Sequence, residues 1–277
     1  MAVGDTSRIN TNIGALNGLN SLREVNSRLE ISQLRLATTK RINEAADDPS
    51  GYSIATSFDQ RARGLQVAYD SVGTAANALS IAEGSLKDIQ KIALNMRDLV
   101  IQGSSDTLGD TERSAINTQL TSLRAEVDRI ASKSTFNGVT LLDGSFTNKR
   151  FQTGDVASDY ISFSISSNFN STSIGIANVS VGTSTQASNS MASVNAAINI
   201  VTTTVQNIGA TVQRMRLVEG NLSVAMVNTQ AAKSRILDAD VAMEQVESTR
   251  LQIIRQMATA QLAQANTAPQ SVLSLFR

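Results

Sequence analysis

Apolar residues recur at helical spacing along most of the chain, in four long segments that flank a short middle of different pattern. The first segment, from about residue 11 to 38, carries apolar residues three, four and seven apart, at Leu22, Val25, Leu29 and Leu36. The second keeps a heptad seam at Leu65, Val72, Leu79, Leu86, Ala93 and Val100 and, three residues later, at Ala68, Ala75, Ala82, Ile89 and Met96. Both patterns predict amphipathic helices, and we expect the heptad seam to pack within its own chain.

Two further helical segments follow. The third is predicted to begin at Asp110 or Thr111, either of which is a suitable N-cap, and it carries Ile116, Leu120, Leu123, Val127 and Ile130. The fourth begins near Met191, repeats apolar residues at coiled-coil spacing and is predicted to continue past residue 260 as one helix. About 70 residues at 1.5 Å each would extend roughly 105 Å, so this helix is expected to lie along the others in a rod.

Between the third and fourth segments the period of the pattern changes to two residues. Asn137-Gly138 and Asp143-Gly144 are turn dipeptides, and Ile161, Phe163 and Ile165 alternate with serines, which predicts short paired strands. Residues 161–190 are rich in Ser, Thr and Asn, a composition typical of a solvated surface segment. We therefore predict a mainly α fold whose first and last helices pair antiparallel, with a small β element from the middle of the chain.

The composition limits the chemistry that the chain can perform. Cys and His are absent, which removes disulfides, thiol nucleophiles and imidazole ligands, and the 24 basic and 24 acidic residues balance. A balanced charge does not favour nucleic acid or an anionic membrane. Asp47-Asp48 and the pair Asp238 and Asp240 are interpreted as helix caps and turn formers rather than as metal ligands. We expect no enzymatic activity, no metal and no cofactor, and no binding to nucleic acid or membrane.

Motifs at both ends resemble those of bacterial flagellins, in the same order along the chain. In the N-terminal half these are Ile9-Asn10-Thr11-Asn12, then Lys40-Arg41-Ile42-Asn43-Glu44-Ala45-Ala46-Asp47-Asp48-Pro49-Ser50-Gly51, then Asp128-Arg129-Ile130 with Thr135-Phe136-Asn137-Gly138. In the C-terminal half they are Ile236-Leu237-Asp238-Ala239-Asp240-Val241 and the run of residues 254–277. The resemblance covers roughly residues 8–144 and 194–277. It implies a structural subunit that polymerises into the flagellar filament for swimming motility.

The resemblance also implies a division of the chain. Residues 1–45 with 238–277 would form the terminal coiled coil that the family calls D0. Residues 46–237 would form the D1 helical rod, with the β-hairpins and the surface segment at 137–190. The middle is too short for large outer domains, so the expected fold is an elongated antiparallel helical rod with a small β-hairpin element. The family further implies export without a cleaved signal peptide and an extracellular location.

The partners that the resemblance implies are further copies of the chain, a flagellar export chaperone, the filament cap and the hook-junction proteins. Assembly is expected to depend on apolar residues near the two ends, namely Ile9, Ile13, Leu16, Leu262, Val272, Leu273, Leu275 and Phe276. Terminal helices that cannot cover their apolar faces alone are expected to order when neighbouring copies arrive.

Two surface regions carry further expectations. Arg97, Leu99 and Glu126 resemble the epitope that the vertebrate Toll-like receptor for flagellin recognises, but Asn95 stands where an Arg is usual. An Arg offers a forked set of donors that Asn lacks, so weakened receptor recognition is expected. Flagellins are often O-glycosylated in the central region, which implies candidate sites at Ser171, Thr172, Ser173, Ser180, Thr183, Ser184 and Thr185.

Two other functions remain as alternatives at this point. A hook-filament junction protein is similar to flagellin at both ends but fills a single ring, and the match of residues 254–277 argues against it. A secreted coiled-coil adhesin would be a soluble particle that never polymerises.

Overall fold

The computed structural model describes the backbone of residues 11–274 and the side chains up to residue 267. Within this range the helices are α1 (Ile13–Thr38), α2 (Pro49–Gly103), α3 (Asp110–Lys133), α4 (Ser184–Leu237) and α5 (Val241–Ser274). The strands are β1 (Thr135–Phe136), β2 (Val139–Thr140), β3 (Phe146–Gln152) and β4 (Tyr160–Ile165). The chain divides into two compact units: unit 1 runs up to Gln60 and resumes at Asn228, and unit 2 is Arg61–Val227. The prediction of a mainly α fold with a small β element is confirmed.

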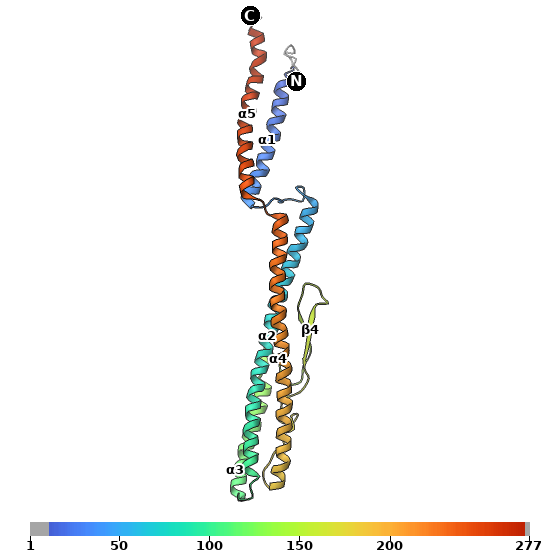
Figure 1. Ribbon diagram of the computed structural model, residues 1–277, viewed down its shortest axis with the longest axis vertical. Coiled ribbons are helices and arrows are strands. Elements are labelled where there is room, and N and C mark those ends of the chain that lie inside the picture. The colour runs from blue at the N-terminus through green and yellow to red at the C-terminus, as the bar shows by residue number, and fades with distance from the viewer. Residues whose placement is uncertain (1–10, 275–277) are drawn as a thin grey trace. The chain divides into compact units, whose positions relative to one another are not determined.

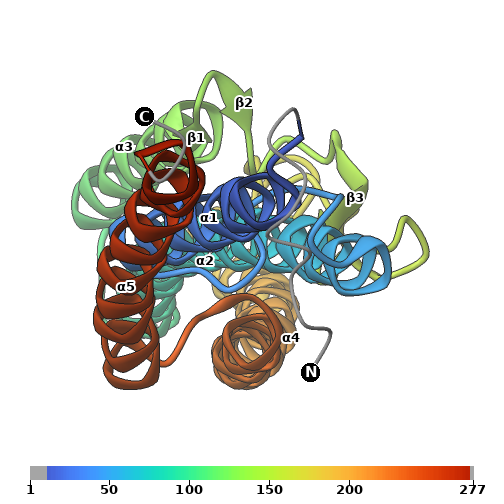
Figure 2. The ribbon, with the colours of Figure 1, turned by 90° about the horizontal axis from the view of Figure 1, so that it is seen from above.

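In unit 1, α1 and α5 lie side by side along their lengths (Figure 1; Figure 2). Their direction is antiparallel, because Asn12, just before α1, contacts Ala265 near the end of α5, whereas Ser32 contacts Glu244 near its beginning. The apolar stripe predicted for α1 faces this pairing, with Leu29 only 3% exposed. The predicted antiparallel pairing of the first and last helices is therefore confirmed.

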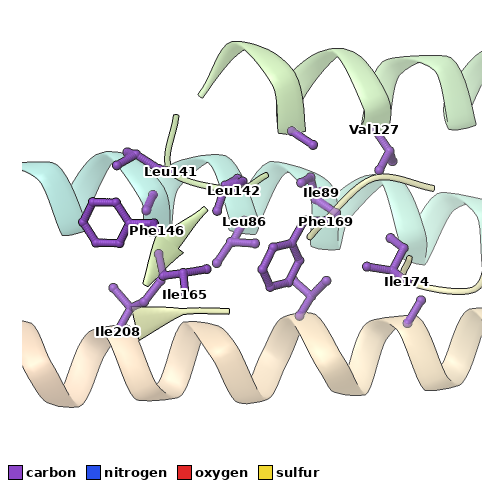
Figure 3. Packing of buried hydrophobic residues seen from close by; sticks show 14 of the residues in the cluster. Leu86, Ile89, Val127, Leu141, Leu142, Phe146, Ile165, Phe169, Ile174 and Ile208 are labelled. Atoms are coloured by element: carbon purple, nitrogen blue, oxygen red, sulfur yellow. The ribbon is translucent and has the colours of Figure 1, made fainter. Parts of the chain in front are cut away.

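In unit 2, α2 and α4 run alongside each other and α3 lies against α2 (Figure 1). Every position of the predicted α2 seam, from Leu65 to Val100, is buried within the chain, which confirms the intramolecular interpretation. Ile116, Leu120 and Val127 of α3 and Val201 and Ile208 of α4 are buried with them. Figure 3 shows this packing around Leu86 and Ile89 of α2.

The two strand pairs are each antiparallel and two-stranded. Asn137 and Gly138 both have positive φ, at 48° and 77°, and join Phe136 to Val139 as the predicted tight turn. In β3 and β4 the pairing shifts register between Phe146 and Lys149, where Asn148 has φ 49°. Such a bulge in a short ribbon bends one strand and allows Phe146, Ile161 and Ile165 to reach the core.

The prediction that residues 161–190 form a solvated surface segment is wrong. We call residues 166–183 the strap, because this stretch without regular secondary structure covers the helical core of unit 2. Five apolar side chains of the strap are at most 2% exposed: Phe169, Ile174, Ile176, Val179 and Val181. Its many Ser, Thr and Asn residues occupy the intervening positions. The polar average composition of the segment therefore concealed its five buried apolar residues.

Polar side chains along α3 hold the backbone of the strap. Asp128 accepts hydrogen bonds from the backbone N–H and hydroxyl of Ser171, at 2.7 and 2.9 Å, and Arg124 donates to the carbonyl of Ala177. Asn117 accepts from the N–H of Val181 at 2.9 Å. Asn117, Arg124 and Asp128 are seven and four residues apart, so their side chains lie on one face of α3. Their hydrogen bonds to the strap replace the backbone pairing that an irregular segment lacks.

Three predicted boundaries differ from the structure. α4 begins at Ser184, seven residues before the predicted start near Met191. The fourth helical segment is two helices, because α4 ends at Leu237 and Asp240 accepts hydrogen bonds from the N–H groups of Ala242 and Met243 at the start of α5. The N-cap of α3 is Gly109, which offers no side-chain cap, and Asp110 is instead the first helical residue. There its carboxylate interacts favourably with the positive end of the helix dipole. α2 ends at Gly103.

Candidate assembly surface

The seam between α1 and α5 is narrow because small side chains line it. Ser32 and Ser248 are each 2% exposed, beside Leu29 and Leu251 at 3% and 4%. The hydroxyl of Ser32 donates to the carbonyl of Glu244 at 3.4 Å. Small residues let two helix backbones approach closely, so this face of each helix is already used within the chain.

The far end of the same seam is fixed by Asn12. Its side-chain oxygen caps α1 by accepting from the N–H of Ala15 at 3.0 Å, and its amide donates to the carbonyl of Ala265 at 2.7 Å. A Cβ added at Gly18 would lie 3.4 Å from Leu262, so Leu262 packs against α1 near this end. Leu262, which was predicted as an assembly contact, therefore makes a contact within its own chain.

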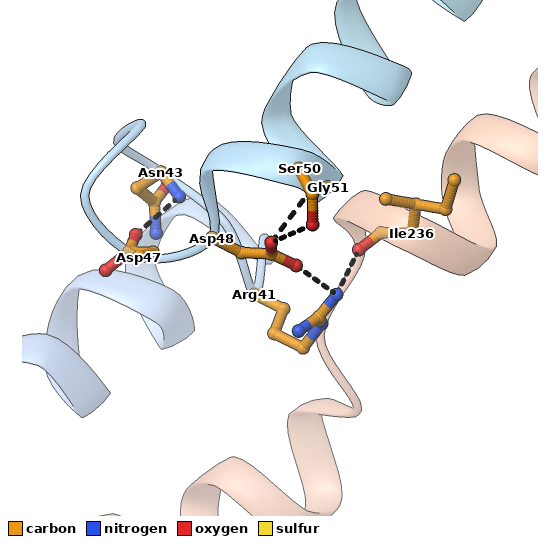
Figure 4. Close-up of polar contacts among 7 residues, drawn as sticks. All are labelled: Arg41, Asn43, Asp47, Asp48, Ser50, Gly51 and Ile236. Atoms are coloured by element: carbon orange, nitrogen blue, oxygen red, sulfur yellow. Dashed lines mark hydrogen bonds and ion pairs between the residues drawn. The ribbon is translucent and has the colours of Figure 1, made fainter.

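The link between α1 and α2 is held against the link between α4 and α5, all within unit 1. The N–H of Arg41 donates to the carbonyl of Leu237 at 2.7 Å, and the N–H of Ala239 donates to the carbonyl of Thr39 at 3.0 Å. The Arg41 guanidinium donates to the carbonyl of Ile236 at 3.0 Å and lies 3.8 Å from the carboxylate of Asp48 (Figure 4). The two contacts from Arg41 to Ile236 and Leu237 satisfy carbonyl groups at the end of α4.

Asp48 caps α2, and Asp47 holds the turn before it by accepting from the N–H groups of Asn43 and Glu44, which confirms the interpretation as cap and turn former made from the sequence. Asp48 accepts from the N–H of Gly51 at 2.9 Å and from the hydroxyl of Ser50, directly before Pro49 at the first position of α2 (Figure 4). The Gly51 N–H, followed by the Ser50 hydroxyl, lowers the pKa of the Asp48 carboxyl. The pKa of Asp47 is lowered first by the N–H of Asn43 and then by that of Glu44.

Outside the seam, unit 1 leaves large apolar side chains uncovered. On α1, Ile13 is 49% and Leu16 is 52% exposed. On α5, a row of apolar residues points away from α1; we call this row the α5 stripe, and it consists of Met243, Val246, Ile253 and Met257. Sequence reasoning missed the stripe, although its spacing of three, seven and four is visible in the sequence.

The other predicted assembly contacts lie outside what the structure describes. Ile9, Leu275 and Phe276 fall outside residues 11–274, and the side chains of Val272 and Leu273 fall outside the described side chains.

The residues of the expected receptor epitope lie on α2 and α3 in unit 2. Asn95 and Arg97 are exposed on α2, and Leu99 is half-buried. On α3, Glu126 is half-buried and pairs with Arg129 through two hydrogen bonds of 2.5 and 2.7 Å. The hydrogen bond with Arg129 lowers the pKa of the Glu126 carboxyl and keeps it ionised.

The candidate glycosylation positions divide into two groups. Thr172, Ser173, Thr183, Ser184 and Thr185 are exposed. Ser171 is 7% exposed, and its hydroxyl donates to Asp128, so the structure removes it as an acceptor for a bulky glycan. Ser180 is half-buried, and both its N–H and its carbonyl bond to the Ser190 hydroxyl.

Among residues 11–274, no helix is both long and apolar enough to cross a membrane. In the same range, no group of three or more Asp, Glu, His or Cys side chains is placed to hold a metal ion.

Comparison with known proteins assigns the family. A model described as the bacterial flagellin N-terminal helical region matches residues 9–147, and one described as the bacterial flagellin C-terminal helical region matches residues 191–276. Flagellin FlaB1 of Treponema pallidum (strain Nichols) is 32% identical over 286 aligned positions, which cover 97% of this chain and 99% of that protein. Flagellin of Bacillus subtilis (strain 168) is 33% identical over 304 aligned positions, which cover 98% and 100%.

One solved structure supports the fold alone. It is that of a candidate flagellar hook-associated protein from Vibrio parahaemolyticus, with a TM-score of 0.59, 15% identity, and coverage of 69% of this chain and 100% of that chain. The two model matches and the near full-length relatives show that this chain belongs to the bacterial flagellins, the structural proteins that polymerise into the extracellular flagellar filament.

Proposed function

We propose that unit 1 is the part of this flagellin that joins one copy to the next, and that the chain has no catalytic role. The observation that carries this proposal is the one-sided burial of α1 and α5. Their small-residue faces meet each other, whereas Ile13, Leu16 and the α5 stripe remain exposed. Contiguous exposed apolar surface on a soluble chain marks a site of association, and a homopolymer supplies other copies to cover it.

The division into a D0-like part of residues 1–45 with 238–277 and a D1-like part of residues 46–237 belongs to the same proposal. It is supported by the ends of α1 and α4, which fall at Thr38 and Leu237, close to these boundaries. The capped link between α1 and α2, with Asp47 and Asp48, would then join the two parts.

The remaining partners follow from the same reasoning about a filament subunit. We propose that the chain is exported without a cleaved signal peptide, escorted by a flagellar export chaperone, and added beneath the filament cap onto the hook-junction proteins. We also propose weakened recognition by the Toll-like receptor, because Asn95 is exposed at a position where the family usually offers an Arg. Glycosylation is proposed only at exposed hydroxyls, among them Thr172 and Ser173.

Seeded polymerisation tests this proposal. Purified intact chain is added to short filament seeds and compared by negative-stain electron microscopy with a chain that lacks residues 254–277. We expect long filaments from the intact chain and none from the shortened one, because the shortened chain loses the later part of α5.

A matched pair of variants locates the contact more finely. Leu16→Asp places a charge at an exposed apolar position of α1, and Asn17→Asp places the same charge at the adjacent exposed polar position. Both should fold, since neither side chain is buried, but only Leu16→Asp should stop elongation because an unpaired charge would be buried between copies. Equal elongation by both variants would remove Leu16 from the contact.

A further inference from the structure

Two exposed methionines form the two ends of the α5 stripe. Met243 is 73% and Met257 is 65% exposed, and Val246 and Ile253 between them are 70% and 53% exposed. Val246 and Ile253 also line a shallow hollow of about 450 Å³ on the same face of α5. The most exposed large apolar side chains of the described part of unit 1 thus gather on one helix face.

Exposure controls how readily a methionine thioether is oxidised. Met96 and Met215, in the core of unit 2, are 0% exposed, and Met191 and Met226 are partly buried against the same core. Of the methionines within residues 11–274, Met243 and Met257 are therefore the two that an oxidant in solution reaches freely.

We infer that Met243 and Met257 form a paired oxidation site, and that their conversion to methionine sulfoxide by a hydroperoxide blocks addition of the chain to a filament. In the reaction the thioether sulfur attacks one peroxide oxygen and the O–O bond breaks. The sulfur gives up two electrons and gains that oxygen, and with hydrogen peroxide the other oxygen leaves as water with both protons. The inference rests on the proposed function, because it requires that another copy of this chain covers the α5 stripe.

The charges beside the stripe favour another copy as the occupant. The charged residues next to it on the helix surface are Glu247 and Arg250, one acidic and one basic, and they pair with each other at 3.3 Å. A helix that binds an anionic membrane surface presents a basic polar face, which this arrangement does not provide. A neutral apolar row instead fits an equally neutral apolar surface, and the homopolymer of this family supplies one.

Oxidation changes the property on which such packing depends. The sulfoxide is a strong hydrogen-bond acceptor, whereas the thioether of methionine is a flexible apolar group that adapts to its neighbours. Burying the sulfoxide against apolar atoms without a donor is unfavourable, so an oxidised stripe should not be covered by a neighbouring copy. The same surface is hidden once the filament has formed, which makes the effect specific to the unassembled chain.

The experiment compares oxidation before and after assembly, using the full chain and dilute hydrogen peroxide. Peptide mass spectrometry gives the oxidised fraction at each methionine, and seeded polymerisation gives the effect on elongation. In the unassembled chain we expect Met243 and Met257 to oxidise at least about tenfold faster than Met96 and Met215, in line with their exposure. In preformed filaments the two stripe methionines should be protected, and oxidised monomer should fail to elongate seeds.

The Met243→Leu, Met257→Leu double variant is the matched control. Leu cannot form a sulfoxide, so peroxide treatment should leave this variant's elongation rate equal to the rate of the same variant without peroxide, whatever that rate is relative to wild type. Equal oxidation of the stripe in monomer and filament, full elongation by oxidised wild type, or equal peroxide inhibition of the Leu variant would each overturn the inference. Untreated wild type serves as the reference, so failure of the proposed function itself would appear separately as absence of filaments without peroxide.

Discussion

The strap is expected to contribute strongly to the stability of unit 2, and Phe169→Ala tests this directly. Phe169 is 0% exposed, its N–H donates to the carbonyl of Leu142 at 2.9 Å, and its ring lies among core residues that include Ile89 (Figure 3). Removing a buried ring that covers roughly 150 Å² costs about 4 kcal/mol at about 25 cal/mol per Å². This agrees with the range of about 3–5 kcal/mol for Phe→Ala in protein cores.

Urea unfolding and thermal unfolding, each followed by circular dichroism, measure this change, with Thr172→Ala as the control because Thr172 is an exposed residue of the same strap. At about 2–4 °C per kcal/mol for a unit of this size, Phe169→Ala should lower the melting temperature by roughly 6–20 °C. The control should change stability by no more than about 0.5 kcal/mol. If Phe169→Ala behaves like the control, the strap is a solvated segment after all and the reasoning about its buried positions fails.

The remaining predictions concern a close contact, a titrating cap and the seam of unit 1. Gly103→Ala would place a Cβ 2.6 Å from the Cβ of Val181, so unit 2 should lose about 1–3 kcal/mol, measured by thermal melting. Because the folded-state pKa of Asp48 lies below its ordinary 3.8, its stabilisation is complete above that value and is lost as the pH falls through the lowered pKa. Asp48→Asn keeps a capping oxygen without a titrating group, so acid titration of helicity should show a weaker pH dependence; an unchanged profile would contradict the capping role. Ser32→Leu, at a site 2% exposed, should separate α1 from α5 and slow seeded elongation, and a normal elongation rate would contradict the close approach of these helices.

The helical part of the fold was readable from the sequence because its apolar periodicity is local. The seam from Leu65 to Val100 repeats without interruption, and each of its positions is buried. The turn at Asn137-Gly138 was equally readable, since its residue types suit positive φ. In both cases the information lies within a few residues of the feature that it determines.

The features that were missed depend on contacts between distant parts of the chain. The break between α4 and α5 is stabilised by an isolated backbone β-bridge between Asp238 and Lys40. Nothing in the apolar pattern near residue 238 requires a break there. Ser32 and Ser248 are polar residues that composition assigns to the surface, yet they are buried because a narrow helix seam needs small side chains. The strap was misassigned for a related reason, since its buried residues are spaced irregularly and are held by α3 rather than by a strand partner.

Copies of this chain should add to one another without limit, and the length of seeded filaments measures whether they do. Increasing amounts of purified intact chain are added to a fixed number of short seeds, and filament lengths are measured by electron microscopy. The mean length should rise in proportion to the amount of chain added, because a helical contact between copies never closes. Growth that stops after a short fixed increment, or seeds that do not grow at all, would contradict it.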